Sequence, residues 1–107
     1  MKEKVYGFLE TIPRGKVATY GQIASVLGNR NLARVVGNIL HSNPDPQRFP
    51  CHRVVNSKGQ VAEQFAFGGA AAQRALLENE GIVFDCDGKI DLKVYAMKLK
   101  EQQSYAD

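Results

Sequence analysis

The sequence predicts a mainly α-helical domain with small β hairpins, arranged as a winged helix-turn-helix. Apolar residues recur at helical spacing in three segments before residue 42, and a short connection containing Gly28 separates two of these segments. Beyond residue 53, short apolar runs flank turn-forming sequences such as Ser57-Lys58-Gly59, as expected of hairpins. The 107 residues suffice for one domain with one core, and we expect the tail from about residue 101 to be disordered.

The first expected helix covers about residues 2–11 and ends before Pro13. Thr19 with Gln22 has the spacing of a capping box and predicts the start of the second helix, which Gly28 ends. Apolar spacing predicts the buried positions, which are Val5, Phe8, Leu9 and Ile12 in the first helix and Ile23, Val26 and Leu27 in the second.

The third expected helix covers about residues 32–41 and is capped by Asn31. One arc of this helix is apolar, and the opposite arc carries hydrogen-bonding side chains between two very small residues. The apolar arc holds Leu32, Val35, Val36, Ile39 and Leu40; the polar arc holds Arg34, Asn38 and His41, flanked by Ala33 and Gly37. Such a face predicts a helix that approaches nucleic acid closely, and the alternative is a routine amphipathic helix with a solvated face.

The rest of the chain alternates turns with short regular segments. Residues 42–48 are proline-rich and predict an irregular loop, and residues 54–61 predict a hairpin or wing. A helix from about 70 to 80 is expected to bury Ala72, Ala75 and Leu76 and to end at Gly81. A second hairpin is expected over 82–90, and Asp91 caps a last helix that continues to about Lys100.

Charge and cysteine content limit the classes of function. Residues 1–58 carry nine Lys/Arg and three Asp/Glu, so this half is compatible with a surface that faces phosphates, although many solvated faces are basic. No apolar stretch is long enough to span a membrane and no signal peptide leads the chain, so we expect a cytoplasmic protein, nucleoid-associated when bound to DNA. Two cysteines with no zinc-binding spacing predict no metal and no cofactor, with Cys86 a structural or surface thiol.

A candidate nucleophile lies in the run Phe49-Pro50-Cys51-His52-Arg53-Val54-Val55. A cysteine acts as a nucleophile in its thiolate form, and a neighbouring imidazole can take its proton. The segment Pro50–Val54 resembles the active-site signature of the O6-alkylguanine-DNA alkyltransferases. Taken singly, Cys51 is more typical of a small buried hydrophobe and His52 of a hydrogen-bonded core histidine; the joint pattern favours chemistry.

The resemblance covers roughly residues 3–81 and implies a role for each matching position. The protein would bind double-stranded DNA in the minor groove as a monomer, flip O6-alkylguanine out of the stack, and transfer the alkyl group irreversibly to Cys51. The implied catalytic residues are Cys51 as nucleophile, His52 as base, Glu80 as the carboxylate that orients His52, Tyr20 as proton donor and phosphate-rotating residue, and Asn43 as hinge. The implied DNA-binding residues are Arg34 as the finger that replaces the flipped base, with Tyr20, Ala33, Gly37, Asn38 and Arg53.

Residues 62–69 depart from the pattern of active alkyltransferases. This loop is two residues longer than theirs and lacks their tyrosine and serine, which predicts a wider pocket with Phe65 or Phe67 as apolar lining. The longer loop, the segment 87–95 and the expected lack of an N-terminal domain resemble the alkyltransferase-like proteins. Those proteins bind the lesion and recruit nucleotide excision repair. They normally have tryptophan or alanine where this chain keeps Cys51.

Three hypotheses of function follow from the sequence. The first is a single-turnover DNA alkyltransferase, and the second is a lesion sensor that recruits nucleotide excision repair proteins while Cys51 stays inert. The third is a winged-helix transcription factor, which would dimerise on palindromic sites and be indifferent to alkylation.

Overall fold

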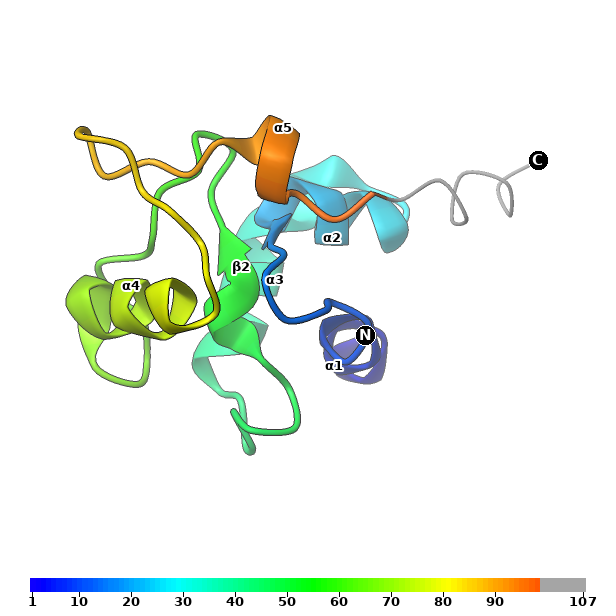
Figure 1. The fold of residues 1–107 in the computed structure, drawn as a ribbon. Helices are drawn as coiled ribbons and strands as arrows, with labels where there is room; N and C mark the ends of the chain where they lie inside the picture. Colours follow the sequence, from blue (N-terminus) through cyan, green and yellow to red (C-terminus); the bar gives the residue numbers. More distant parts are fainter. Residues whose placement is uncertain (99–107) are drawn as a thin grey trace.

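A small parallel sheet at the centre of the fold joins two groups of helices (Figure 1). The structure is a computed structural model that describes residues 1–98. Its elements, in chain order, are α1 (Lys2–Leu9), β1 (Ala18–Thr19), α2 (Tyr20–Val26), the 3-10 turn η1 (Arg30–Leu32), α3 (Ala33–His41), the 3-10 turn η2 (Cys51–Arg53), β2 (Val54–Val55), α4 (Gly69–Asn79) and α5 (Leu92–Tyr95). Among the described residues, no helix has the length and apolar character that crossing a membrane requires.

The sheet divides the core into two clusters. β1 and β2 pair in parallel, with Ala18 opposite Val54 and Thr19 opposite Val55. Successive strand residues point to opposite faces, so Val54 packs among side chains of α1, α2 and α3, whereas Val55 packs with Leu77 of α4. Figure 1 shows β2 between α4 and the group formed by α1, α2 and α3. Cys51, just before β2, belongs to the cluster of the three N-terminal helices.

The second helix begins at the predicted capping box. The Thr19 hydroxyl accepts a hydrogen bond from the Gln22 amide at 3.0 Å, and the Gln22 side chain accepts one from the Thr19 amide at 2.8 Å. Gly28 follows α2 with φ +97°, a conformation that favours glycine. One expected core position is wrong: Val26 is 37% exposed and Ala24 is buried instead.

The third helix begins one residue later than expected, after a 3-10 turn. Asn29 caps the 3-10 turn η1, where its side chain accepts from the Asn31 amide at 2.9 Å, and α3 itself follows Leu32 without a side-chain cap, so the prediction of Asn31 as cap is wrong. The turn places Leu32 ahead of α3 rather than inside it, and Val35 is 37% exposed. The remaining members of the predicted apolar arc are buried: Val36, Ile39 and Leu40.

The two predicted hairpins exist mainly as turns. After β2, the Asn56 amide donates to the Gln60 carbonyl at 3.1 Å, but β2 pairs with β1 instead of a returning strand. The second turn, closed by a bond from the Asp85 amide to the Lys89 carbonyl, is flanked by a single antiparallel bridge between Phe84 and Ile90. The prediction of a strand hairpin at 54–61 is wrong because the partner of β2 lies far back in the sequence.

Helix α4 has the predicted bounds but a different buried face. Gln73 and Leu77 are buried, whereas Leu76 is 42% exposed and Ala75 is exposed, so the predicted inward face is wrong by one position. Asp91 caps α5 as expected, through a bond from the Lys93 amide at 3.0 Å, but α5 ends at Tyr95. The predictions for residues 99–107 lie outside the described residues.

Two glycines provide a matched test of this fold. Gly59 has φ +79° and lies against the Ile90 backbone, so an added Cβ would clash with the Ile90 carbonyl oxygen. Gly7 lies inside α1 with open space around its Cα. We expect Gly59→Ala to lower the free energy of unfolding by about 2 kcal/mol or more. Gly7→Ala should raise it by about 0.5–1 kcal/mol, measured by urea denaturation. Equal effects at both positions would contradict the close approach of Gly59 and Ile90.

Candidate active site

Cys51 lies at an open pocket of about 500 Å³ between α3 and the segment 62–66. Its side chain is almost covered, with 5% of the residue exposed. The residues of the predicted polar face of α3 line one side, and the segment 62–66 lines the other. The lining residues are Tyr20, Ala33, Arg34, Gly37, Asn38, Leu40, His41, Cys51, Ala62, Gln64, Phe65 and Ala66. The structure thus brings Cys51 and Tyr20 together with most of the residues that the sequence assigned to DNA binding.

A tight turn fixes the backbone of Cys51. Its amide donates to the Phe49 carbonyl at 2.7 Å, and the Arg53 amide donates to the Pro50 carbonyl at 3.0 Å. The buried Asn43 side chain also donates to the Phe49 carbonyl, at 2.7 Å, and accepts from the Asp45 amide at 3.0 Å. Asn43 therefore ties the proline-rich loop to the residue that enters the turn, where the sequence placed a hinge.

The surroundings of Cys51 keep its proton on sulfur in this structure. Burial raises the pKa of the Cys51 thiol, and hydrogen bonds from the Asn43 side chain and the Cys51 backbone lower it only in part. Burial and the nearby Cys51 charge also raise the pKa of Tyr20. Both shifts favour the protonated side chains at neutral pH, so the Cys51 thiol would need a base before it could act as a nucleophile.

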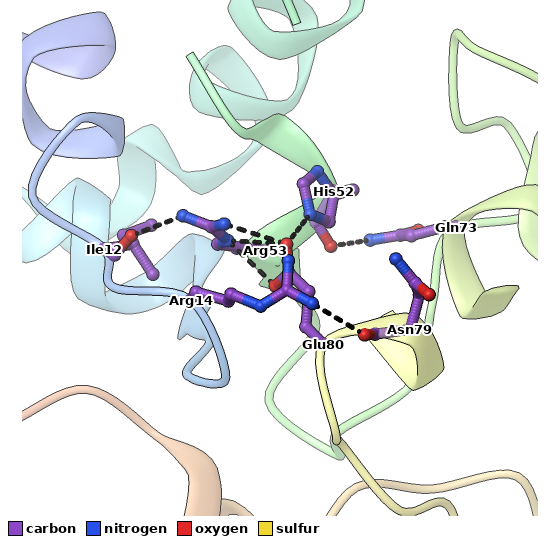
Figure 2. A network of polar contacts seen from close by, with 7 residues as sticks. All are labelled: Ile12, Arg14, His52, Arg53, Gln73, Asn79 and Glu80. Atoms are coloured by element: carbon purple, nitrogen blue, oxygen red, sulfur yellow. Dashed lines mark hydrogen bonds and ion pairs between the residues drawn. The ribbon is translucent and has the colours of Figure 1, made fainter. Parts of the chain in front are cut away.

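The carboxylate of Glu80 binds both residues that follow Cys51 (Figure 2). Its Oε2 lies 2.9 Å from His52 Nε2 and 2.8 Å from Arg53 Nη2, and its Oε1 accepts from Arg53 Nε at 2.9 Å. Burial alone would raise the pKa of Glu80, but the hydrogen bonds and charges of Arg53 and His52 lower it to about 2. The ionised carboxylate makes Nε2 the protonated nitrogen of neutral His52, which leaves Nδ1 with a lone pair that can accept a proton.

Arg53 serves this network inside the protein. Its Nη1 donates to the Ile12 carbonyl at 2.8 Å while Nε and Nη2 bind Glu80, and its side chain is 17% exposed. Every nitrogen of the guanidinium thus has a protein partner. The DNA contact expected of Arg53 stays a prediction, and the geometry assigns this side chain a structural role.

Sequence reasoning missed Gln73, a polar residue that is 1% exposed. Its side chain bonds the carbonyls of His52 and Val54 and the amide of Ala62. A helical pattern could have found it, because Gln73 and Leu77 lie seven and three residues before Glu80 and so share its face of α4.

The other candidate residues separate into pocket and surface. His41 and Phe65 line the pocket, whereas Phe67 does not line it, is 40% exposed and packs edge-on against Phe65 with ring centroids 5.8 Å apart. Cys86 is an exposed free thiol in the turn at 85–89. Within residues 1–98, no group of three His, Cys, Asp or Glu side chains is arranged to hold a metal ion.

The fold and the site define a small helix-rich domain that presents a buried thiol to an open pocket, and the residue after this cysteine is a histidine bound to a glutamate. Residues 1–82 match the family model described as 6-O-methylguanine DNA methyltransferase, DNA binding domain, and the chain belongs to this family. It is 38% identical over 81 residues to the methylated-DNA–protein-cysteine methyltransferase of Mus musculus, covering 76% of this chain and 38% of that protein. The chain therefore spans less than half the length of this relative.

Shorter relatives match over most of their length. The chain is 37% identical over 92 residues to the DNA base-flipping protein of Vibrio parahaemolyticus, covering 86% of this chain and 90% of that protein. Among solved structures, S. pombe Atl1 in complex with damaged DNA containing O6-carboxymethylguanine aligns with a TM-score of 0.79 and 35% identity, over 92% of this chain and 94% of that chain. Mycobacterium tuberculosis OGT in complex with DNA aligns with a TM-score of 0.68 and 38% identity, over 75% and 48%.

The depressed pKa of Glu80 predicts a specific loss of stability in acid. The folded value of about 2 lies below the ordinary 4.5, so ionised Glu80 stabilises the fold above pH 5 and this contribution is lost as the pH falls toward 2. We expect it to be worth about 3 kcal/mol at pH 7 and to shrink by about 2 kcal/mol at pH 3.

The measurement is the free energy of unfolding of wild type and Glu80→Gln between pH 3 and pH 7. Glu80→Gln should be the less stable protein at pH 7, and the gap should narrow steadily toward pH 3. A gap that is constant across this range would show that Glu80 titrates normally.

Proposed function

We propose that this protein recognises O6-alkylguanine in duplex DNA, takes the flipped base into the pocket beside Cys51, and accepts its alkyl group there in one irreversible turnover. The observation that carries the proposal is the position of the Cys51 thiol at a pocket large enough for a base, with the next residue in the chain, His52, held by an ionised glutamate. The family assignment and the DNA-bound structures of similar proteins support the same function.

The proposed transfer is a displacement at the carbon attached to O6. The Sγ of Cys51 forms a bond to this carbon while the bond from carbon to O6 breaks, and the electron pair stays on the guanine. The thiol proton passes to His52 Nδ1, and the departing guanine takes a proton from the Tyr20 hydroxyl. Return of the His52 proton to Tyr20 restores both side chains. The net change is one thioether on Cys51 and one unalkylated guanine in the DNA.

The DNA-binding part of the proposal uses α2, η1 and α3 as a helix-turn-helix and the turn at 56–60 as its wing. Ala33 and Gly37 leave the pocket face of α3 nearly flat, which suits close approach to a minor groove. Arg34 is exposed at the pocket and has the reach to fill the gap left by an extruded base. The minor groove comes from the family resemblance, since ordinary helix-turn-helix proteins use the major groove.

A second candidate function is lesion sensing without chemistry, followed by recruitment of nucleotide excision repair. Two observations favour it. The raised pKa of Cys51 disfavours the thiolate, and the alignment with S. pombe Atl1 covers more of both chains than the alignment with the mycobacterial OGT. The two functions share lesion binding and differ only in the fate of Cys51.

Intact-mass spectrometry separates these functions. After incubation with excess duplex DNA that contains O6-methylguanine, we expect one methyl group per protein molecule, and peptide mapping should place it on Cys51. The rate should rise with pH through the neutral range, because the raised pKa of Cys51 limits the thiolate fraction.

Two variants control this experiment. Cys86→Ser removes the exposed thiol and should leave the transfer unchanged, whereas Cys51→Ser should abolish the transfer and keep lesion binding. Unmodified wild-type protein together with tight lesion binding would reject the enzyme and support the sensor. Absence of both modification and selective binding would reject both.

The finger role of Arg34 predicts a selective loss of lesion binding. Extrusion of a base costs a few kcal/mol, so Arg34→Ala should weaken binding to O6-methylguanine duplex by about 1–2 kcal/mol more than binding to undamaged duplex. Lys58, exposed in the turn at 56–60, is the matched control: Lys58→Ala should weaken both complexes equally and reduce the salt slope by about one. Fluorescence titrations with both duplexes measure these affinities, and equal losses for Arg34→Ala would assign Arg34 to phosphate contact.

A further inference from the structure

The buried side chain of Gln73 connects two parts of the pocket that are distant in sequence. Its Nε2 donates to the His52 carbonyl at 3.0 Å and to the Val54 carbonyl at 2.8 Å, and its Oε1 accepts from the Ala62 amide at 2.8 Å. Figure 2 shows the side chain reaching the His52 carbonyl. Both amide hydrogens and the amide oxygen are therefore used.

These bonds fix the orientation of the Gln73 amide. A rotation by 180° would turn its oxygen toward two carbonyl oxygens and its NH₂ group toward the Ala62 amide, so all three bonds would be lost. Because Gln73 is 1% exposed, water cannot replace these partners. The Gln73 side chain thus holds Ala62 in a fixed position relative to His52 and Val54.

Ala62 is the residue from which the second wall of the pocket begins. The segment that follows folds back through hydrogen bonds from the Phe65 amide to the Ala62 carbonyl and from the Gly69 amide to the Phe65 carbonyl. Phe65 and Ala66 face the pocket from this segment. The opposite wall, α3, is held by buried side chains of the core. Two kinds of contact therefore hold the wall that carries Phe65: the bond from Ala62 to Gln73 and the packing of Phe65 against the core cluster.

We propose that Gln73 is a positioning residue that sets the width of the pocket and so determines which alkyl substituents reach Cys51. As a statement about lesions it rests on the proposed function, but the width of the pocket is a property of the protein alone. Loss of the bond to Ala62 lets the wall of residues 62–66 move outward. Bulky electrophiles then gain access to Cys51 more than small ones do.

The test uses thiol reagents of two sizes in a Cys86→Ser background, in which Cys51 is the remaining cysteine. The readout is the ratio of the Cys51 rate constants for N-phenylmaleimide and iodoacetamide. Gln73→Met, which has a similar length and no hydrogen-bonding group, should raise this ratio at least fivefold. Gln73→Glu should keep it within twofold of wild type, because a buried, protonated glutamate still accepts from the Ala62 amide.

Leu77→Ala provides the control for a general loss of stability. Leu77 is buried on the same face of α4, one turn from Gln73, and packs in the cluster around Val55 rather than at the pocket wall. This variant should lose stability and leave the ratio of rate constants unchanged. Equal ratios in wild type and Gln73→Met, or an equal rise in Leu77→Ala, would overturn the proposal.

Hydrogen exchange of the Ala62 amide gives a second readout that needs no reagent. Exchange should accelerate at least tenfold in Gln73→Met and remain slow in Gln73→Glu.

For lesion DNA, the affinity ratio of O6-benzylguanine to O6-methylguanine duplex should rise in Gln73→Met. If wild type binds neither lesion, the proposed function fails while the thiol and exchange measurements still decide the role of Gln73.

Discussion

Three distant segments of the chain meet at the carboxylate of Glu80. The residue lies at the end of α4, His52 and Arg53 approach it from η2, and Arg53 continues to the carbonyl of Ile12 behind α1. The Glu80 carboxylate and the Arg53 guanidinium are both largely buried. Removing these charges from water is unfavourable, so the pair depends on its multiple well-aligned hydrogen bonds as well as on charge attraction. The position of α4, the orientation of the imidazole and the course of the chain after α1 all depend on this contact.

The two residues of β2 belong to different core clusters. Val54 and the helices α1 to α3 enclose Cys51, while Val55, Leu77, Ile82 and Ile90 form a second cluster that holds α4 in place. Glu80 and Gln73 both project from α4, so the second cluster controls the histidine and the pocket wall at once. Cys51 therefore lies in one cluster, whereas Gln73 and Glu80, which bond the neighbouring residue His52, belong to the helix end that the other cluster holds.

The sequence predicted what local patterns encode. The capping box at Thr19 and the cap at Asp91 follow from side chains that bond their own neighbours in sequence, and the stop at Gly28 follows from the positive φ that glycine adopts; each is present. The predicted ends of the helices lie close to the observed ones because these local signals mark where helices begin and end. Parallel pairing of Val54 with Ala18 has no local signature, so β2 was expected in a hairpin.

The candidate site was predicted in part by resemblance. The motif around Cys51 and the spacing to Glu80 led to the residues that the structure gathers at the pocket and in the carboxylate network. Helical spacing could have indicated that Gln73 is buried, but the bonding partners of Gln73 and Arg53 lie 11 to 41 residues away in sequence, so local patterns do not identify them. The buried face of α4 was missed because alanine and leucine at neighbouring positions fit two adjacent faces equally well.

The parallel register of β1 and β2 also orders the events of folding. Ala18 and Val54 are joined by a long helical crossover, and closing an unstructured loop of this length costs about 3 kcal/mol of chain entropy. Prior formation and docking of α2 and α3 shortens the loop and reduces this cost. The turn that carries Cys51 leads into β2, and Glu80, which binds His52 and Arg53 of this turn, lies further along the chain at the end of α4. We therefore expect Cys51 to reach its final position only when β2 pairs with β1, after the helices that precede it in the chain have formed.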